Sequence, residues 1–147
     1  MAAGGLVRGT EGNASARAGE VIAISPSALP YETLQPEEVC LVTPGGVLVE
    51  GPTPSVELPM HLAVLAARPD VGAVVHTHSP RATIRPPVPV AEAAPSGTPE
   101  LGRAVLAAAG DGDAVVIRGH GPVCFGVDLA AALARALEVE QLAKASP

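Results

Sequence analysis

Glycine and proline divide this chain into short segments, and that division limits the folds open to it. The chain has 16 Gly and 16 Pro among 147 residues, and no apolar run between them reaches the roughly 18 residues that a membrane-spanning helix needs. Apolar residues still make up 48% of the chain, which is enough for a buried core and too many for a disordered protein. We therefore expect one domain, residues 1–147, built from short strands and helices.

Short apolar runs bounded by turn residues predict the strands, and stretches with helical spacing predict the helices. The predicted strands are Val21–Ile24, Val39–Val42, Val47–Val49, Ala73–His76, Ala114–Ile117 and Val123–Phe125. The predicted helices are Pro59–Ala67, Glu100–Ala109 and Leu129–Ala143, the second with Thr98 as N-cap and Pro99 at its first position. The five prolines between Thr83 and Glu100 predict a rigid extended connection. This order indicates an α/β fold with a central sheet covered by helices.

Charge and aromatic content argue against nucleic acid as a partner. The net charge is -6, and Tyr31 and Phe125 are the only aromatic residues of the Phe, Trp and Tyr set. Binding to DNA or RNA uses clustered Lys and Arg, often with aromatic stacking surfaces. Cys40 and Cys124 match no paired-cysteine motif and lie in apolar runs, so we expect buried free thiols. The N-terminus lacks a basic start followed by an apolar stretch, and we expect a cytoplasmic protein that binds no membrane.

Two histidines stand two residues apart at the end of an apolar strand. His76 and His78 lie in the segment AVVHTHSP. Residues i and i+2 of an extended chain share a face, so both imidazoles can reach one cation. A third histidine, His120, follows another buried-strand pattern and lies between Gly119 and Gly121, which permit a sharp turn and a close approach. The pair alone fits two polar residues at a strand end equally well, but three imidazoles predict a catalytic metal centre with an open position.

Glu57 lies just before or within the first turn of a predicted helix, in PSVELPMH. A carboxylate there is also ordinary helix-start chemistry, because the helix dipole favours it. His61 lies four residues further on, on the same helix face, and is predicted as a packing residue or as a hydrogen-bond partner of the site rather than as a ligand.

Two loops could bind phosphate without a basic patch. The first, RGTEGNASAR, contains Gly12 and Asn13, and the second, AISPSALPY, contains Ser25 and Ser27. Backbone N–H groups in glycine-containing turns can cradle a phosphate, although either loop could equally be a plain turn.

Together these motifs resemble the class II aldolase/adducin family. Gly12-Asn13-Ala14-Ser15 is similar to the family's G-N-x-S loop, Ser25-Pro26-Ser27-Ala28 to its T-P-[ST]-G loop, and Pro54-Ser55-Val56-Glu57 to its P-S-S-E motif. RPDVGAVVHTHSP and RGHG are similar to the segments that carry the family's metal histidines. The resemblance runs from about Gly5 to Ala143.

The resemblance implies a three-layer α/β/α fold with a mainly antiparallel central sheet, assembled as a homotetramer. It implies one Zn²⁺ per subunit on His76, His78 and His120, which would bind a ketose phosphate and stabilise the enediolate formed on carbon–carbon cleavage. Glu57 would be the acid/base, and Gly12, Asn13, Ser25, Ser27 and Ser55 would bind the phosphate. The implied activity is that of a ketose 1-phosphate aldolase; a glutamate at position 57 favours an aldolase or a dehydratase over an epimerase.

Three departures from the family pattern bear on this activity. About twenty residues that carry a catalytic tyrosine in the family are missing between Thr83 and Ile84, and Tyr31 lies in a different loop. Ala28 replaces a glycine and Val56 a serine of the phosphate loops. We therefore expect either a chain from which a segment has been left out or a non-catalytic module like the adducin head.

Overall fold

Eight strands pair into one sheet in the computed structural model, which describes residues 1, 5–7 and 9–145. Within those residues the strands are β1 Asn13–Ala18, β2 Val21–Ile24, β3 Cys40–Val42, β4 Leu48–Glu50, β5 Ala73–His76, β6 Val90–Ala91, β7 Ala114–Ile117 and β8 Gly121–Gly126. Their order is β4-β3-β2-β1-β5-β8-β7-β6. Every neighbouring pair is antiparallel except β6 and β7.

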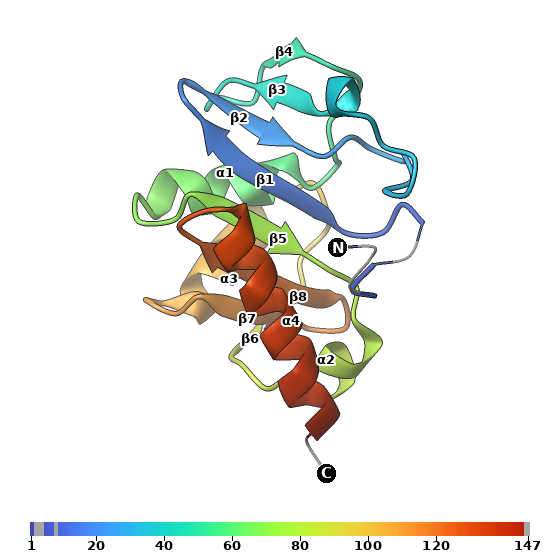
Figure 1. Ribbon diagram of the computed structural model, residues 1–147. Coiled ribbons are helices and arrows are strands. Elements are labelled where there is room, and N and C mark those ends of the chain that lie inside the picture. Colours follow the sequence, from blue (N-terminus) through green and yellow to red (C-terminus); the bar gives the residue numbers. More distant parts are fainter. Residues whose placement is uncertain (2–4, 8, 146–147) are drawn as a thin grey trace.

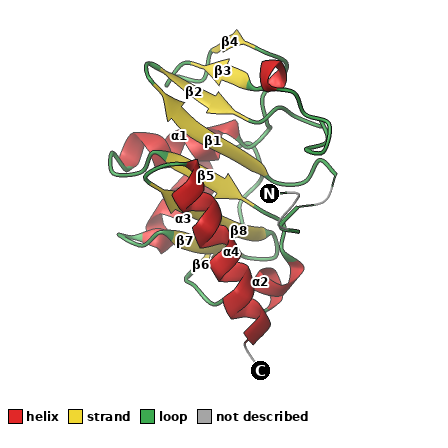
Figure 2. Cartoon of the chain, in the orientation of Figure 1, coloured by secondary structure: helices red, strands yellow, loops and turns green. Residues whose placement is uncertain are grey.

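Helices cover both faces of this sheet. They are α1 Leu58–Ala67, α2 Pro80–Ile84, α3 Pro99–Ala109 and α4 Leu129–Ala145, with a 3-10 turn at Pro36–Glu38. Figure 1 shows α4 crossing one face while α1 and α3 lie behind the other, and Figure 2 shows the same layers by element type. One core cluster packs α1 and α3 against the sheet, and a second packs α2 and α4 against the opposite face. The predicted three-layer, mainly antiparallel fold is confirmed.

The six predicted strands and three predicted helices all form, with ends that shift by no more than two residues; β8, for example, also takes in Gly121 and Pro122. Thr98 is the N-cap of α3 and Pro99 its first residue, but the Thr98 hydroxyl donates to the Pro95 carbonyl at 2.7 Å instead of capping the helix. Cys40 and Cys124 are buried free thiols, as expected, and burial raises the pKa of Cys124 to about 12. None of the described helices has the length and hydropathy to cross a membrane.

The prediction of an extended connection between Thr83 and Glu100 is wrong at its start, and part of that connection is a strand of the sheet. Thr83 and Ile84 end the short helix α2, which Ser79 caps by accepting from the Ala82 N–H. Residues Val90–Ala91 then form β6, parallel to β7 at the edge of the sheet. Proline has no N–H to donate, but an edge strand needs only one side of its backbone, and the Pro89 carbonyl accepts from the Val116 N–H.

The structure also contains a strand that the sequence did not predict, β1. Its polar residues Asn13 and Ser15 are the buried ones, and they alternate only with Ala14 and Ala16, which pack against the core of the other face, so the strand lacks the β-branched and aromatic residues that mark a strand in sequence. It nevertheless lies at the centre of the sheet, between β2 and β5.

Candidate metal centre

Two neighbouring strands carry the three histidines to one point. His76 ends β5 and pairs with Val123 of β8, while His120 belongs to the turn that joins β7 to β8. A Cβ at Gly121 would collide with the Thr77 carbonyl oxygen, so this turn can approach the His76–His78 segment only with glycine there. The turn is closed by a 3.0 Å hydrogen bond from the His120 N–H to the Ile117 carbonyl.

The three imidazoles converge through their Nε2 atoms. His76 Nε2 lies 3.0 Å from His78 Nε2 and 3.4 Å from His120 Nε2, and the latter two are 3.1 Å apart. Three nitrogens bound tetrahedrally to one zinc at about 2.1 Å would lie about 3.4 Å from one another. The observed triangle is close to that arrangement, and its ligand atoms and the Glu57 carboxylate all lie within 4.8 Å of one another. The residues present therefore fit a divalent metal.

The protonation of His76 also suits a metal ligand. Its Nδ1 lies 2.9 Å from the Pro122 carbonyl oxygen, which can only accept, so Nδ1 carries the proton and Nε2 presents its lone pair. Burial lowers the pKa of His76, which is fully enclosed, and burial likewise lowers the pKa of His78. Neutral imidazoles are the form that binds metal.

Glu57 lies beside this cluster, at the N-cap of α1. One carboxylate oxygen is 3.2 Å from His76 Nε2, and the other is 3.7 Å from His120 Nε2. Burial acts to raise the pKa of Glu57, but hydrogen bonds from Asn13 and Ser96 to its carboxylate act the other way, and that pKa lies below its usual value. The site thus presents an ionised carboxylate next to a potential metal.

A cavity of about 250 Å³ opens over this carboxylate. Its described lining includes Gly12, Asn13, Ser27, Ser55, Glu57, His78 and His120. A bridge between Pro26 and Pro54 holds the two serine-containing loops together. Most of the predicted phosphate residues therefore share one cavity with the metal cluster.

Ser25 does not line that cavity. Its hydroxyl accepts from the Ala14 N–H at 3.1 Å and lies 3.2 Å from the Tyr31 hydroxyl oxygen. The Tyr31 hydroxyl donates to the Gly12 carbonyl at 2.9 Å, so this phenol connects the loop of Gly12 to the loop of Ser25. Burial raises the pKa of Tyr31.

Sequence reasoning missed Ser96, which lines the cavity and donates to Glu57 at 3.2 Å. It lies in the proline-rich segment, and a single serine in such a segment carries no pattern that would single it out. Only the approach of this segment to α1 places it at the site.

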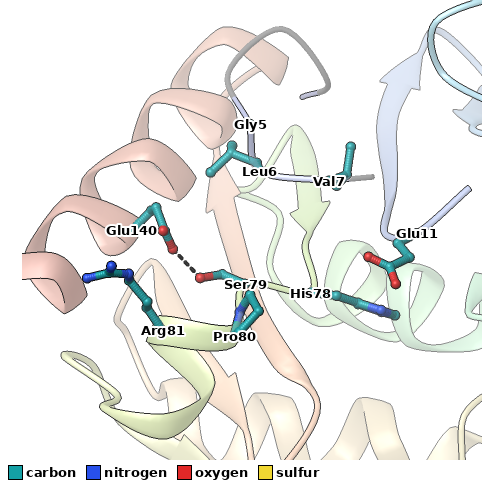
Figure 3. Close-up of a pocket in the computed structure, with 9 residues that line it drawn as sticks. All are labelled: Gly5, Leu6, Val7, Glu11, His78, Ser79, Pro80, Arg81 and Glu140. Atoms are coloured by element: carbon teal, nitrogen blue, oxygen red, sulfur yellow. Dashed lines mark hydrogen bonds between the residues drawn. The ribbon is translucent and has the colours of Figure 1, made fainter. Parts of the chain in front are cut away.

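A second, larger cavity of about 430 Å³ reaches the site from the other side of His78. Figure 3 shows Glu11 and His78 at one end of it and Ser79, Arg81 and Glu140 at the other, where Ser79 donates to Glu140. The two cavities share Glu11 and His78. Neither Glu57 nor His120 lines the larger one, whereas both line the smaller one.

Comparison with known proteins identifies the family. The Class II Aldolase and Adducin N-terminal domain matches residues 1–86 and 83–146. The 5-methylthioribulose-1-phosphate/5-deoxyribulose-1-phosphate aldolase of Rhodospirillum rubrum is 38% identical, over 95% of this chain and 72% of that protein. The L-fuculose phosphate aldolase of Escherichia coli K12 is 33% identical, over 95% of this chain and 74% of that protein.

A solved structure of an L-fuculose 1-phosphate aldolase superposes with a TM-score of 0.88 at 31% identity, covering 95% of this chain and 76% of that one. Motifs, fold and relatives agree along nearly the whole chain. The chain therefore belongs to the class II aldolase and adducin family, and its relatives within that family support a lyase enzyme.

Proposed function

We propose that this protein cleaves and forms a ketose 1-phosphate by a metal-dependent aldol reaction, giving dihydroxyacetone phosphate and an aldehyde. The observation that carries the proposal is the convergence of three imidazole Nε2 atoms and one ionised carboxylate beside a cavity whose other wall is made of serine- and glycine-containing loops. Aldolases among its relatives support the same reaction class.

His76, His78 and His120 would hold one Zn²⁺ per subunit. Bound there, the metal would supply Lewis-acid chemistry to the substrate carbonyl. The protein's own part is to keep three neutral imidazoles aimed at one point, which the Pro122 carbonyl does for His76 by fixing its tautomer.

Glu57 would move the proton on the substrate carbon. Its carboxylate faces the cavity. Hydrogen bonds from Asn13 to Oε2 at 2.9 Å and from Ser96 to Oε1 at 3.2 Å fix the orientation of the carboxylate. A base placed within reach of the reacting carbon typically contributes about 10²–10⁴-fold to the rate.

The phosphate would bind to Gly12, Asn13, Ser27 and Ser55. Ser25 would support this site indirectly, because its hydroxyl accepts from the Ala14 N–H. Ser27 and Ser55 lie on facing loops of the same cavity, and the Ser27 N–H bonds to the Thr53 carbonyl while the Ser55 N–H bonds to the Ser25 carbonyl. These bonds fix the loops. Ser55 Oγ accepts from the Glu57 N–H at 3.3 Å and keeps its own proton to donate to the ligand.

The relatives set the substrates to test. L-Fuculose 1-phosphate, 5-deoxyribulose 1-phosphate and 5-methylthioribulose 1-phosphate appear in the names of proteins similar to this one. An epimerase would instead return an isomeric pentulose phosphate, and a methylthioribulose-phosphate dehydratase would release water. A non-catalytic module like the adducin head would turn over none of them.

We further propose a cytoplasmic homotetramer and a segment missing between Thr83 and Ile84. The family match breaks at this place, and the alignment with the R. rubrum enzyme spans 159 residues against 147 in the whole chain. Ile84, which is 77% exposed at the end of α2, is the kind of side chain that such a segment would cover. Sequencing the encoding DNA across this junction checks the proposal; an uninterrupted reading frame would refute it.

The test of function is release of dihydroxyacetone phosphate from the three ketose phosphates by the zinc-loaded protein. We expect Glu57→Gln and His76→Ala to lose at least about 10²-fold in kcat while the fold persists. Glu138→Gln, on the exposed side of α4, is the matched control and should keep full activity. Wild-type protein that binds zinc but converts no substrate would refute the aldolase proposal and favour the non-catalytic module.

A further inference from the structure

A line of buried hydrogen bonds connects the polar face of β1 to the catalytic carboxylate through α1. Ser15 Oγ lies 2.7 Å from His61 Nδ1, and His61 Nε2 lies 2.5 Å from Asn13 Oδ1. Asn13 Nδ2 then donates to Glu57 Oε2 at 2.9 Å. Each of the four side chains is at most 5% exposed.

Simple periodicity brings these four residues together. Asn13 and Ser15 are i and i+2 in β1, so they share the face of the sheet that meets α1. Glu57 and His61 are i and i+4 at the start of α1, so they share the face of the helix that meets the sheet. The two pairs interleave because the strand and the helix pack directly on each other at this end.

The chemistry of the groups sets the direction of every proton in the line. The Asn13 amide nitrogen, which can only donate, faces Glu57 Oε2 at 2.9 Å. The amide oxygen therefore faces His61, whose Nε2 must carry the proton. His61 Nδ1 is then the acceptor, and the Ser15 hydroxyl donates to it. All the donors point the same way, toward Glu57.

Burial keeps His61 in the neutral form that this line requires. Desolvation lowers the pKa of His61 to about 4, although Glu57 acts to raise it. An imidazolium would place protons on both ring nitrogens and leave the Ser15 hydroxyl facing a donor.

We propose that His61 and Ser15 are positioning residues, which hold the Asn13 amide with its nitrogen toward Glu57 and so fix the acid/base carboxylate over the metal centre. The inference rests on the role proposed for Glu57. Neither residue touches the cavity that receives the substrate. Their effect on catalysis passes through Asn13, whose amide could otherwise rotate and turn its oxygen toward the carboxylate.

The first test reads the hydrogen bonds without any turnover. Imidazole ¹⁵N spectra of the metal-free protein at pH 7 should show His61 as the Nε2–H tautomer, assigned by the signal that His61→Gln removes. One side-chain amide proton of Asn13 should be shifted downfield and protected from exchange. His61→Leu should lose both properties of that proton, while His61→Gln, whose amide keeps a donor near the Nε2 position, should retain them. The Nδ1–H tautomer or an imidazolium would overturn the proposal.

The second test is kinetic and uses a ketose phosphate that the wild-type protein converts. We expect His61→Leu to lower kcat about 10- to 100-fold with little change in KM and with unchanged zinc content, and His61→Gln to recover most of that loss. In an Asn13→Ala background, His61→Leu should cost nothing further, because the group that it positions is gone. Full additivity of the two effects would assign His61 to core packing alone and overturn the proposal.

The two tests separate the two proposals. If wild-type protein converts no substrate, the proposed function fails, and the positioning of Asn13 is still decided by the amide spectrum. If turnover is found but His61→Leu leaves the Asn13 amide proton and kcat unchanged, the aldolase proposal stands and the positioning proposal fails.

Discussion

Gly121 controls how closely the two halves of the metal centre can approach each other. A Cβ at position 121 would overlap the carbonyl oxygen of Thr77, in the link between His76 and His78. Any side chain at position 121 would push the turn that carries His120 away from the other two imidazoles. This is a case of glycine used for close approach of backbones rather than for an unusual φ.

We predict that Gly121→Ala lowers zinc affinity at least tenfold and lowers the free energy of unfolding by about 2 kcal/mol, within the range for overpacking. Competition with a chelating dye and urea denaturation would measure the two effects. Gly45→Ala is the control, because a Cβ there meets only the Thr43 hydroxyl, at 3.7 Å. Equal zinc affinity in the two variants would contradict this explanation of Gly121.

Ala28 is the one non-glycine residue with positive φ among the described residues, at 59°. It stands where the sequence comparison with the family pattern expects glycine. The left-handed conformation costs an L-residue about 1–2 kcal/mol, while glycine costs about 0.5–1 kcal/mol of extra chain entropy.

Ala28→Gly should therefore stabilise the protein, by about 0.5–1 kcal/mol. Thermal denaturation compared with Ala109→Gly, which replaces a buried residue at the end of α3, checks the sign. The control should be destabilised. A loss of stability in Ala28→Gly would mean that the strain at this loop is smaller than its φ indicates.

At the scale of elements, β1 and α1 form one functional unit. The strand supplies Asn13 and Ser15, and the helix supplies Glu57 and His61. Because β1 alternates its polar residues only with alanine and has no β-branched or aromatic residue, it was not recognised as a strand, whereas α1 was predictable from its apolar spacing. The short β6 and α2 escaped prediction for a related reason, since backbone and side-chain hydrogen bonds rather than apolar periodicity define them.

The burial of His61 in this unit makes stability depend on pH. The unfolded chain binds a proton at His61 below about pH 6.5, but the folded protein does so only near pH 4. The contribution of neutral His61 to the free energy of unfolding is complete above pH 6.5 and is lost as pH falls from 6.5 toward 4. Between pH 7.5 and pH 5 the free energy of unfolding of the metal-free wild type should fall by about 2 kcal/mol more than that of His61→Gln. Urea denaturation at the two pH values measures it, and parallel losses would refute it.

At the scale of the molecule, the site joins the end of β5 and the neighbouring β7–β8 turn to the start of a helix on one face of the sheet. His120 comes from the β7–β8 turn, His76 from β5, and Glu57 from the start of α1. A metal bound to these residues would therefore bind the folded state and not the unfolded chain, which stabilises the fold by mass action.

Zinc at a hundredfold excess over its dissociation constant adds about 2.7 kcal/mol, which corresponds to roughly 5–10 °C in Tm for a chain of this size. We expect a chelator to remove this increment in the wild type. His76→Ala should show no zinc-dependent increment at all. Differential scanning calorimetry with and without zinc distinguishes the cases, and an equal zinc response in His76→Ala would contradict the proposed ligand set.

Native mass spectrometry tests the assembly and the integrity of the chain together. The proposals predict a tetramer with one zinc per subunit and a subunit heavier than 14.6 kDa. A metal-free monomer at that mass would contradict both the tetramer and the missing segment.

By itself, the sequence determined the apolar strands of the sheet, its three main helices and the residue types of the metal centre, because apolar periodicity and the H-x-H spacing are local properties. It also carried the family motifs, which the comparisons confirmed. Only the tertiary structure decided that β1 is a central strand, that Ser96 reaches Glu57, that Ser25 lies outside the cavity, and that Asn13 is held by His61. Those facts depend on contacts between residues far apart in the chain, and such contacts leave no local pattern to find.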